Sequence, residues 1–145
     1  MTNVLSARAA VIGLGSMGYG IAASLRRAGL DVAGCDVSAA AVRRFESEGG
    51  RGAATPAEAA AGADVVFSVV VNAAQTEAVL FGPDGCAAAF ADAAVFVSCA
   101  TMSPGDARSL AGRVEAAGAR YLDAPISGGA QRAAEGQLTV LASGR

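Results

Sequence analysis

The sequence predicts an α/β domain of the doubly wound type, a three-layer αβα arrangement with a mainly parallel sheet between two layers of helices. Short apolar runs alternate with helical patterns about every 25–30 residues, as in successive βαβ units. A glycine-rich turn joins the first apolar run to the first helical pattern. The run DVVFSVVV has no alternation of apolar and polar residues, as expected for a strand buried on both faces of a parallel sheet.

The first half of the chain holds four predicted strands, at residues 9–13, 31–36, 52–54 and 64–71. Apolar residues recur at helical spacing from Met17 to Ala28, and Gly29 is placed to end this helix. Ser38 is the predicted N-cap of the second helix, which Gly49 would end. The stretch TPAE predicts a capping box, with Thr55 as N-cap and Glu58 three residues later.

The second half continues the same alternation. A helix is predicted at residues 72–82, followed by a strand at 93–100. Ser103 is expected to cap the next helix, with Pro104 in its first turn and Gly118 at its end. Two more strands are predicted, at residues 119–124 and 137–143. We find no linker or repeat, so residues 1–145 are expected to form one continuous domain.

Composition excludes several classes of protein. No apolar run approaches the roughly 20 residues of a membrane span, and no signal peptide is recognised at the start, so a cytoplasmic protein is expected. The net charge is −2 and the arginines are scattered, which argues against a nucleic-acid partner. Cys35, Cys86 and Cys99 are far apart in apolar surroundings, so we expect buried thiols and no metal site.

All 11 basic residues are arginines, and the 145 residues contain neither lysine nor histidine. A histidine general base, a Schiff-base lysine and a P-loop lysine are therefore excluded within this chain.

The segment VIGLGSMGYGIAASL carries the strongest motif. Its Gly13, Gly15 and Gly18 lie between a predicted strand and a predicted helix, with Leu14, Ser16 and Met17 between them. In a dinucleotide-binding (Rossmann-type) turn the first glycine permits the bend, the second admits a pyrophosphate and the third allows close packing of helix and strand. A tight turn without a ligand is the alternative.

Asp36 strengthens the dinucleotide interpretation. It ends the second predicted strand eighteen residues after Gly18, close to the position of the acid that binds a ribose 2′-hydroxyl. A carboxylate there would repel a 2′-phosphate, and Val37 and Ser38 offer no positive charge, so NAD is favoured over NADP. A methyltransferase fold also combines a glycine-rich turn with an acid after the second strand, but its cofactor has no pyrophosphate.

Two separated motifs make the chain resemble the β-hydroxyacid dehydrogenase family. VIGLGSMGYGIAASL is similar to its cofactor signature, and DAPISGGAQRAAEGQLTV is similar to its substrate signature. CATMSP matches the family's loop after the fifth strand, although Ser98 and Ala100 replace its frequent Asp and Ser. VVNAAQTEAVLFG and LTVLASG resemble the branch that oxidises L-threonate.

The resemblance implies roles for particular residues. Val71, Asn72 and Thr101 would lie beside the cofactor, with Thr101 next to the nicotinamide. The substrate carboxylate would be held by Ser127, Gly128 and Gly129. Hydride would pass from a small 2- or 3-hydroxy acid such as L-threonate to NAD. Tyr121 is expected in the core, and Asp123 is expected to orient the loop that follows it.

In the resembled family a helical second domain follows and supplies the catalytic lysine. We therefore expect a truncated or split form of such an enzyme that binds NAD, has no catalytic residue of its own and turns over slowly or not at all. A noncatalytic NAD-binding module, or a subunit that joins a separate helical chain, is the alternative. Uncovered apolar surface would favour self-association into a homo-oligomer.

Overall fold

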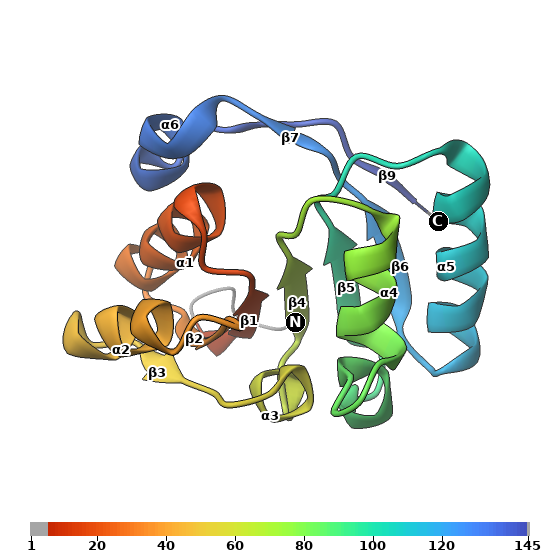
Figure 1. Cartoon of the computed structure of the whole chain (residues 1–145), viewed down its shortest axis with the longest axis horizontal. Helices are drawn as coiled ribbons and strands as arrows, with labels where there is room; N and C mark the ends of the chain where they lie inside the picture. Colours follow the sequence, from red (N-terminus) through yellow and green to blue (C-terminus); the bar gives the residue numbers. More distant parts are fainter. Residues whose placement is uncertain (1–5, 145) are drawn as a thin grey trace.

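A computed structural model of the chain describes residues 6–144 and contains a seven-stranded sheet in the order β3-β2-β1-β4-β5-β6-β9 (Figure 1). The first six of these strands pair in parallel, and β9 pairs with β6 in the antiparallel direction. The doubly wound prediction is confirmed. The strands are β1 (Arg8–Ile12), β2 (Asp31–Cys35), β3 (Arg51–Gly52), β4 (Val65–Ser68), β5 (Val95–Ser98), β6 (Arg120–Asp123) and β9 (Ser143–Gly144).

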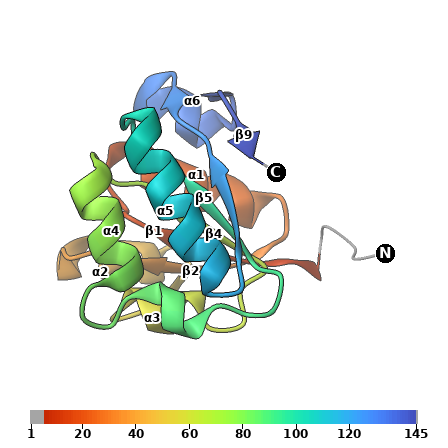
Figure 2. The same ribbon diagram turned by 90° about the vertical axis from the view of Figure 1, so that its right-hand side faces the viewer.

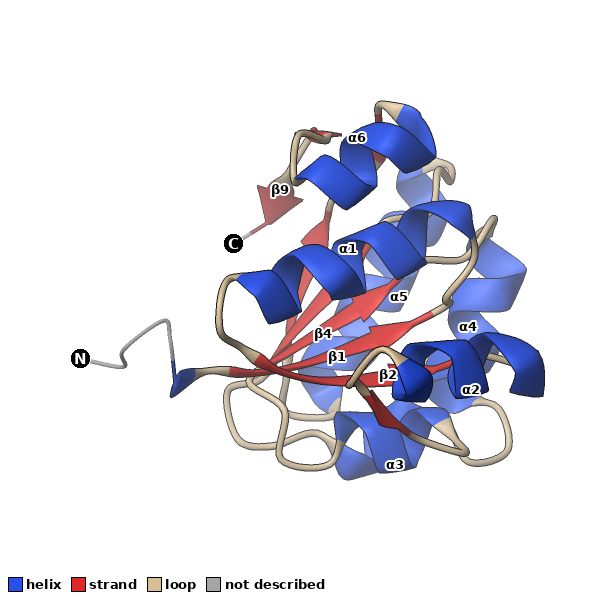
Figure 3. Ribbon diagram, turned by 90° about the vertical axis from the view of Figure 1, so that its left-hand side faces the viewer, coloured by secondary structure: helices blue, strands red, loops and turns tan. Residues whose placement is uncertain are grey.

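Helices cover both faces of the sheet (Figure 3). One face carries α1 (Ser16–Arg27) and α2 (Ala39–Ser47). The other carries α3 (Pro56–Ala60), α4 (Ala73–Phe81), the 3-10 helix η2 (Cys86–Ala89) and α5 (Pro104–Ala116), and Figure 2 shows α4 and α5 side by side. Alternate residues of β1 explain the two layers: Ala9 and Val11 belong to the core beneath α1, whereas Ala10 and Ile12 belong to the core beneath α3 and α5.

The helix starts follow the predicted capping residues. Ser38 accepts a hydrogen bond from the Ala41 amide at 3.3 Å, and Ser103 accepts one from the Asp106 amide at 3.1 Å. In the predicted capping box, Thr55 Oγ1 accepts from the Glu58 amide at 3.1 Å. The Glu58 carboxylate accepts from the Ala54 amide at 3.1 Å, one residue before the N-cap. Each bond satisfies an amide that has no partner within the helix.

Two predicted strands are wrong in extent. β4 ends at Ser68, and the chain leaves the sheet so that Val71 is 75% exposed, although residues 64–71 read as one buried run. The predicted strand 137–143 is two short strands in different sheets: β8 (Thr139–Val140) pairs with β7 (Ile126–Ser127), and β9 joins the main sheet. Continuous apolarity does not locate the residue at which pairing stops.

The helix α6 (Gly129–Glu135) was not predicted. Its sequence GAQRAAE contains no large apolar residue, and glycines stand on both sides, so its periodicity gives no helical signal. Together with β7 it lies beyond the carboxyl ends of β4 and β5, next to α1 (Figure 1). Among residues 6–144 no helix has the length and apolar character needed to cross a bilayer.

Candidate cofactor and substrate site

The glycine-rich turn between β1 and α1 has two positions that exclude any side chain. Gly13 has φ +103°, and a Cβ there would lie 2.2 Å from the Val69 carbonyl oxygen. A Cβ on Gly18 would lie 1.8 Å from the Gly13 carbonyl oxygen. Gly13 therefore makes the bend and Gly18 brings the helix against it, the geometric roles that the motif predicts.

Gly15 is different, because a Cβ built on it would meet nothing within 4 Å. It is the N-cap of α1, and no side chain among the described residues caps this helix. The Tyr19 amide, bonded to the Gly15 carbonyl at 2.9 Å, starts the helical ladder. The amides of Ser16 and Met17 precede it, so the start of α1 is open to an acceptor such as a phosphate.

Asp36 holds this turn to the end of β2. Its Oδ2 accepts a hydrogen bond from the Leu14 amide at 2.7 Å, and its Oδ1 accepts one from the Ser38 amide at 2.8 Å. The carboxylate lines a cleft of about 570 Å³, a volume typical of ligand sites. Other residues around the cleft are Ile12, Gly13, Gly15, Cys35, Val37, Ala54, Pro56, Val69, Val70, Val71, Gln75, Ala78, Val79 and Pro83.

Val71 and Asn72 lie where the chain turns from β4 into α4. Val71 lines the cleft, and its amide donates to Gln75 Oε1 at 2.9 Å. The Asn72 side chain caps α4, accepting from the Gln75 amide at 2.9 Å. Gln75 was missed by the sequence analysis, although the spacing Asn-x-x-Gln is a capping-box signal.

The remaining predicted residues lie apart from this cleft. Thr101 is exposed in the loop after β5. Ser127 is exposed in β7, and Gly128 and Gly129 follow it with φ of +137° and +78°. Thr101 follows the carboxyl end of β5, and the segment of β7 and α6 lies beyond the carboxyl ends of β4 and β5, the edge at which open α/β sheets bind ligands (Figure 1).

Comparison with known proteins identifies the family. Residues 8–145 match the family described as the NAD binding domain of 6-phosphogluconate dehydrogenase. The chain belongs to this NAD-binding domain family.

The relatives include an L-threonate dehydrogenase of Cupriavidus necator, 49% identical over 140 residues that make up 97% of this chain and 47% of the relative. That of Haemophilus influenzae is 45% identical, over 93% of this chain and 45% of the relative. A crystal structure of a Salmonella typhimurium 3-hydroxyisobutyrate dehydrogenase superposes with a TM-score of 0.91 at 41% identity, covering 96% of this chain and 48% of that one. The chain thus spans about half the length of these relatives.

The cleft of this NAD-binding domain is compatible with the family's cofactor. Gly15 leaves the start of α1 open on the same cleft that Asp36 lines. Residue Arg43, not considered in the sequence analysis, lines an adjoining pocket of about 510 Å³ together with Asp36 and Val37. None of the ion pairs found within residues 6–144 involves Arg43, so this pocket contains a positive charge that is not paired with a carboxylate there.

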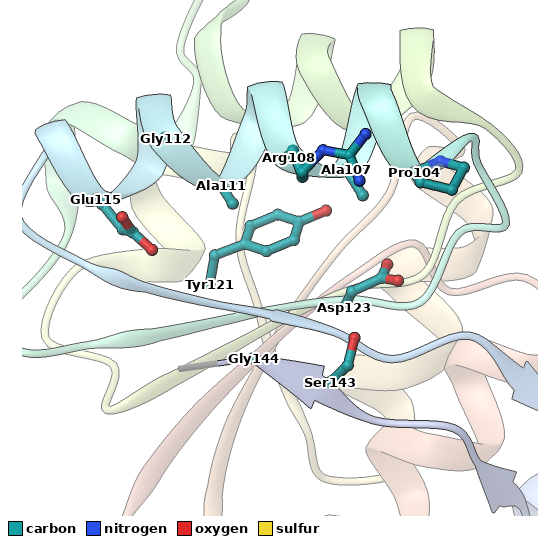
Figure 4. Close-up of a pocket in the computed structure, with 10 residues that line it drawn as sticks. All are labelled: Pro104, Ala107, Arg108, Ala111, Gly112, Glu115, Tyr121, Asp123, Ser143 and Gly144. Carbon is teal, nitrogen blue, oxygen red and sulfur yellow. The ribbon is translucent and has the colours of Figure 1, made fainter.

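Tyr121 and Asp123 lie in a different part of the NAD-binding domain. They line a pocket of about 360 Å³ between α5, β6 and β9 (Figure 4). Tyr121 is 7% exposed and stacks on Phe96 with ring centroids 6.0 Å apart, which confirms its place in the core. Burial raises the pKa of the Asp123 carboxyl, whose Oδ1 has no hydrogen-bond partner in the described part of the chain. Asp123 therefore faces α5 and does not line the cofactor cleft.

The three cysteines are free and buried, as predicted. Burial raises the pKa of the thiols of Cys35 and Cys99 to about 11 and that of Cys86 to about 12. These thiols are protonated at neutral pH, so they carry no nucleophilic chemistry there. Residues 6–144 contain no cluster of histidine, cysteine, aspartate or glutamate with the composition of a metal site.

Proposed function

We propose that this NAD-binding domain serves an oxidoreductase that transfers hydride between NAD and a small hydroxy acid. The observation that carries the proposal is the juxtaposition of the open N-terminus of α1 at Gly15 with the Asp36 carboxylate on one cleft. The amides of Gly15, Ser16 and Met17 would receive the pyrophosphate, because they start an uncapped helix. Asp36 would accept from a ribose hydroxyl.

The substrate side of the proposal rests on the loops at the carboxyl ends of the strands. Val71, Asn72 and Thr101 would line the nicotinamide, while Ser127, Gly128 and Gly129 would hold the substrate carboxylate. When bound, NAD accepts the hydride released by the alcohol carbon. L-threonate or a similar 2- or 3-hydroxy acid is the proposed substrate, supported by relatives of that name at 49% and 45% identity.

These residues would bind and orient the cofactor and the substrate. Oxidation of an alcohol also needs a group that takes the hydroxyl proton, and the 145 residues contain no lysine or histidine. Asp123, the carboxylate nearest to the Ser127 turn in sequence, faces α5. We therefore name no catalytic residue in this chain, and a noncatalytic NAD-binding module is the second candidate that this composition favours.

The first test measures cofactor choice by titration calorimetry with NAD and NADP. We expect the chain to bind NAD more tightly than NADP. Asp36→Ala should reduce this difference in affinity, because it removes the carboxylate that repels a 2′-phosphate. Any NADP affinity gained by Asp36→Ala should fall again in the Asp36→Ala/Arg43→Ala double variant. Equal affinity of the unmodified chain for both cofactors would contradict the role of Asp36. S-adenosylmethionine serves as a control that should release no binding heat.

The second test measures NADH formation from L-threonate. We expect no rate above background for the chain alone, with NAD binding retained. A robust rate that disappears in Ser127→Ala would show that this chain contains a proton acceptor after all. Binding of NAD without turnover, followed by activity on addition of a separately produced helical chain, would favour a split enzyme over a noncatalytic module.

We place this function in the cytoplasm, where the reducing conditions keep thiols such as the three free cysteines reduced. Val140 and Leu141, which are 51% and 68% exposed, are the residues through which self-association would proceed. Sedimentation velocity of the chain tests this, and a monomer at high concentration would argue against a homo-oligomer.

A further inference from the structure

The helix α6 packs directly against α1 (Figures 1 and 3). A Cβ on Gly20 of α1 would lie 2.6 Å from the Ala134 amide nitrogen and 2.8 Å from the Ala133 Cβ. Ala133 is 1% exposed at this contact. Only glycine at position 20 allows the backbone of α6 to approach to this distance. The close contact therefore depends on a glycine in α1 and on the small side chain of Ala133 in α6.

Two polar side chains of α1 also donate hydrogen bonds to carbonyl groups of α6. Ser24 Oγ donates to the Ala133 carbonyl at 2.8 Å, and the Arg27 guanidinium donates to the Ala134 carbonyl. Arg27 also donates to Ser24 Oγ at 2.9 Å, which links the two side chains. The last carbonyls of a helix lack partners within the helix, and a cation is favoured beside them. Ser24 and Arg27 thus bond two of the last carbonyls of α6, and the Gln137 amide bonds that of Arg132 at 2.8 Å.

These contacts define the position of α6. A helix of seven residues is not stable by itself, so its place is set by what it packs against. Its beginning, Gly128–Gly129, follows Ser127 directly. The same helix α1 therefore starts at the Gly15 turn and, one to three turns later, anchors the segment that carries Ser127.

We propose that Gly20, Ser24 and Arg27 are positioning residues that couple the cofactor turn to the Ser127–Gly129 turn through the rigid body of α1. The coupling rests on the proposed function, because the proposed function assigns the cofactor phosphates to the Gly15 turn and the hydroxy acid to the Ser127–Gly129 turn. None of the three residues lines the cofactor cleft, so they act through α6 and not on the cofactor. Ordering of the α1 N-terminus by NAD thereby lowers the mobility of α6, and the substrate turn is ordered before the substrate arrives.

The experiment is hydrogen exchange of the whole chain with and without NAD, read by mass spectrometry. In the unmodified chain NAD should slow exchange by about tenfold both at residues 14–19 and at residues 129–136. In Ser24→Ala the slowing at 14–19 should remain and that at 129–136 should disappear, with the NAD dissociation constant changed by less than about twofold. Ser24→Thr, which keeps the hydroxyl, should restore the effect.

Ser47→Ala is the matched control, since Ser47 Oγ also donates to a helix carbonyl, that of Arg44 at 2.7 Å, but on α2. It should leave the NAD effect on α6 unchanged. Gly20→Ala is the second disruptive variant, since its methyl group would overlap α6, and it should also abolish the slowing at 129–136. If it fails to fold, Arg27→Met takes its place with the same expected result. NAD protection at 129–136 that persists in Ser24→Ala, or is lost equally in Ser47→Ala, would overturn the coupling alone. A chain that binds no NAD by calorimetry would instead overturn the proposed function, and the coupling with it.

Discussion

At the scale of single residues, the three glycines of the motif have separable roles. Gly13 and Gly18 are required by packing, since a Cβ at either would overlap a backbone carbonyl oxygen. Gly15 borders open space and its φ of −70° is accessible to any residue. Its lack of a side chain is therefore not explained by packing within the domain, which agrees with the proposed close approach of a phosphate to the start of α1.

This difference leads to a paired prediction. Gly18→Ala should lower the free energy of unfolding by about 1–3 kcal/mol or more, because the added methyl group must displace backbone. Gly15→Ala should lower it by about 1 kcal/mol or less, the cost of alanine at an N-cap, but weaken NAD binding by about tenfold or more. Urea denaturation and calorimetry measure the two quantities. Equal loss of stability in both variants would contradict the assignment of Gly15 to the ligand.

Asp123 gives a second prediction at this scale. Because burial raises its pKa, the folded state favours the neutral carboxyl, and this contribution to stability is present at low pH and is lost as pH rises through the folded pKa. Asp123→Asn should therefore be more stable than the unmodified chain at pH 7, with an advantage that shrinks toward pH 4.

Thermal denaturation of both proteins between pH 4 and pH 8 measures this difference. Asp92→Asn, at an exposed position, is the control and should show little effect. An advantage of Asp123→Asn that grows toward low pH would have the wrong sign for a carboxyl with a raised pKa.

At the scale of elements, the helix starts could be predicted because their capping contacts are local. The helix and strands after Asp123 could not, because their positions depend on distant parts of the chain. Ser38, Thr55 and Ser103 act within three residues, so the sequence alone identifies them. α6 depends on a contact with α1 more than a hundred residues earlier, and its alanines show no periodicity. β8 and β9 are also determined by distant partners. In the site, the glycine turn and Asp36 were predictable as a motif, whereas Arg43 required the fold to bring α2 beside β2.

The capping box of α3 provides the prediction at this scale. Thr55→Ala should lower the free energy of unfolding by about 1 kcal/mol, because the Glu58 amide loses its acceptor. Thr55→Ser should recover most of this loss, since it keeps the hydroxyl. Urea denaturation of the three proteins tests it, and a serine variant as unstable as the alanine variant would show that the threonine methyl group, not the cap, provides the stability.

At the scale of the whole molecule, the sheet separates two main cores that must be lost together when the domain unfolds. Phe45 and Tyr19 fill the core beneath α1 and α2, while Phe96, Leu80 and Val114 fill the core on the opposite face. The β1 residues alternate between these cores, so neither survives without the strand. Cys35 and Cys86 belong to the second core, and Cys99 lies in a smaller cluster with Val97 and Ala124.

The buried thiols therefore report on unfolding of the whole domain at alkaline pH. Their pKa values rise from an ordinary value of 9.0 to about 11 or 12 on folding, so above pH 9 the unfolded chain releases protons that the folded chain retains. The unfolded state then binds fewer protons, and the free energy of unfolding must fall as the pH rises from 9 toward 11. The raised pKa values of Tyr19 and Tyr121 act in the same direction above pH 10.

Urea denaturation at pH 8, 9 and 10 should show this progressive fall, and Cys86→Ala isolates one thiol. That variant should be less stable at pH 8, because it loses the packing of a fully buried sulfur, but its stability should decline less steeply with pH. The two curves should therefore converge as the pH increases. Parallel curves would show that the Cys86 thiol does not titrate between the folded and unfolded states in this range, and that the decline belongs to the tyrosines or to other groups.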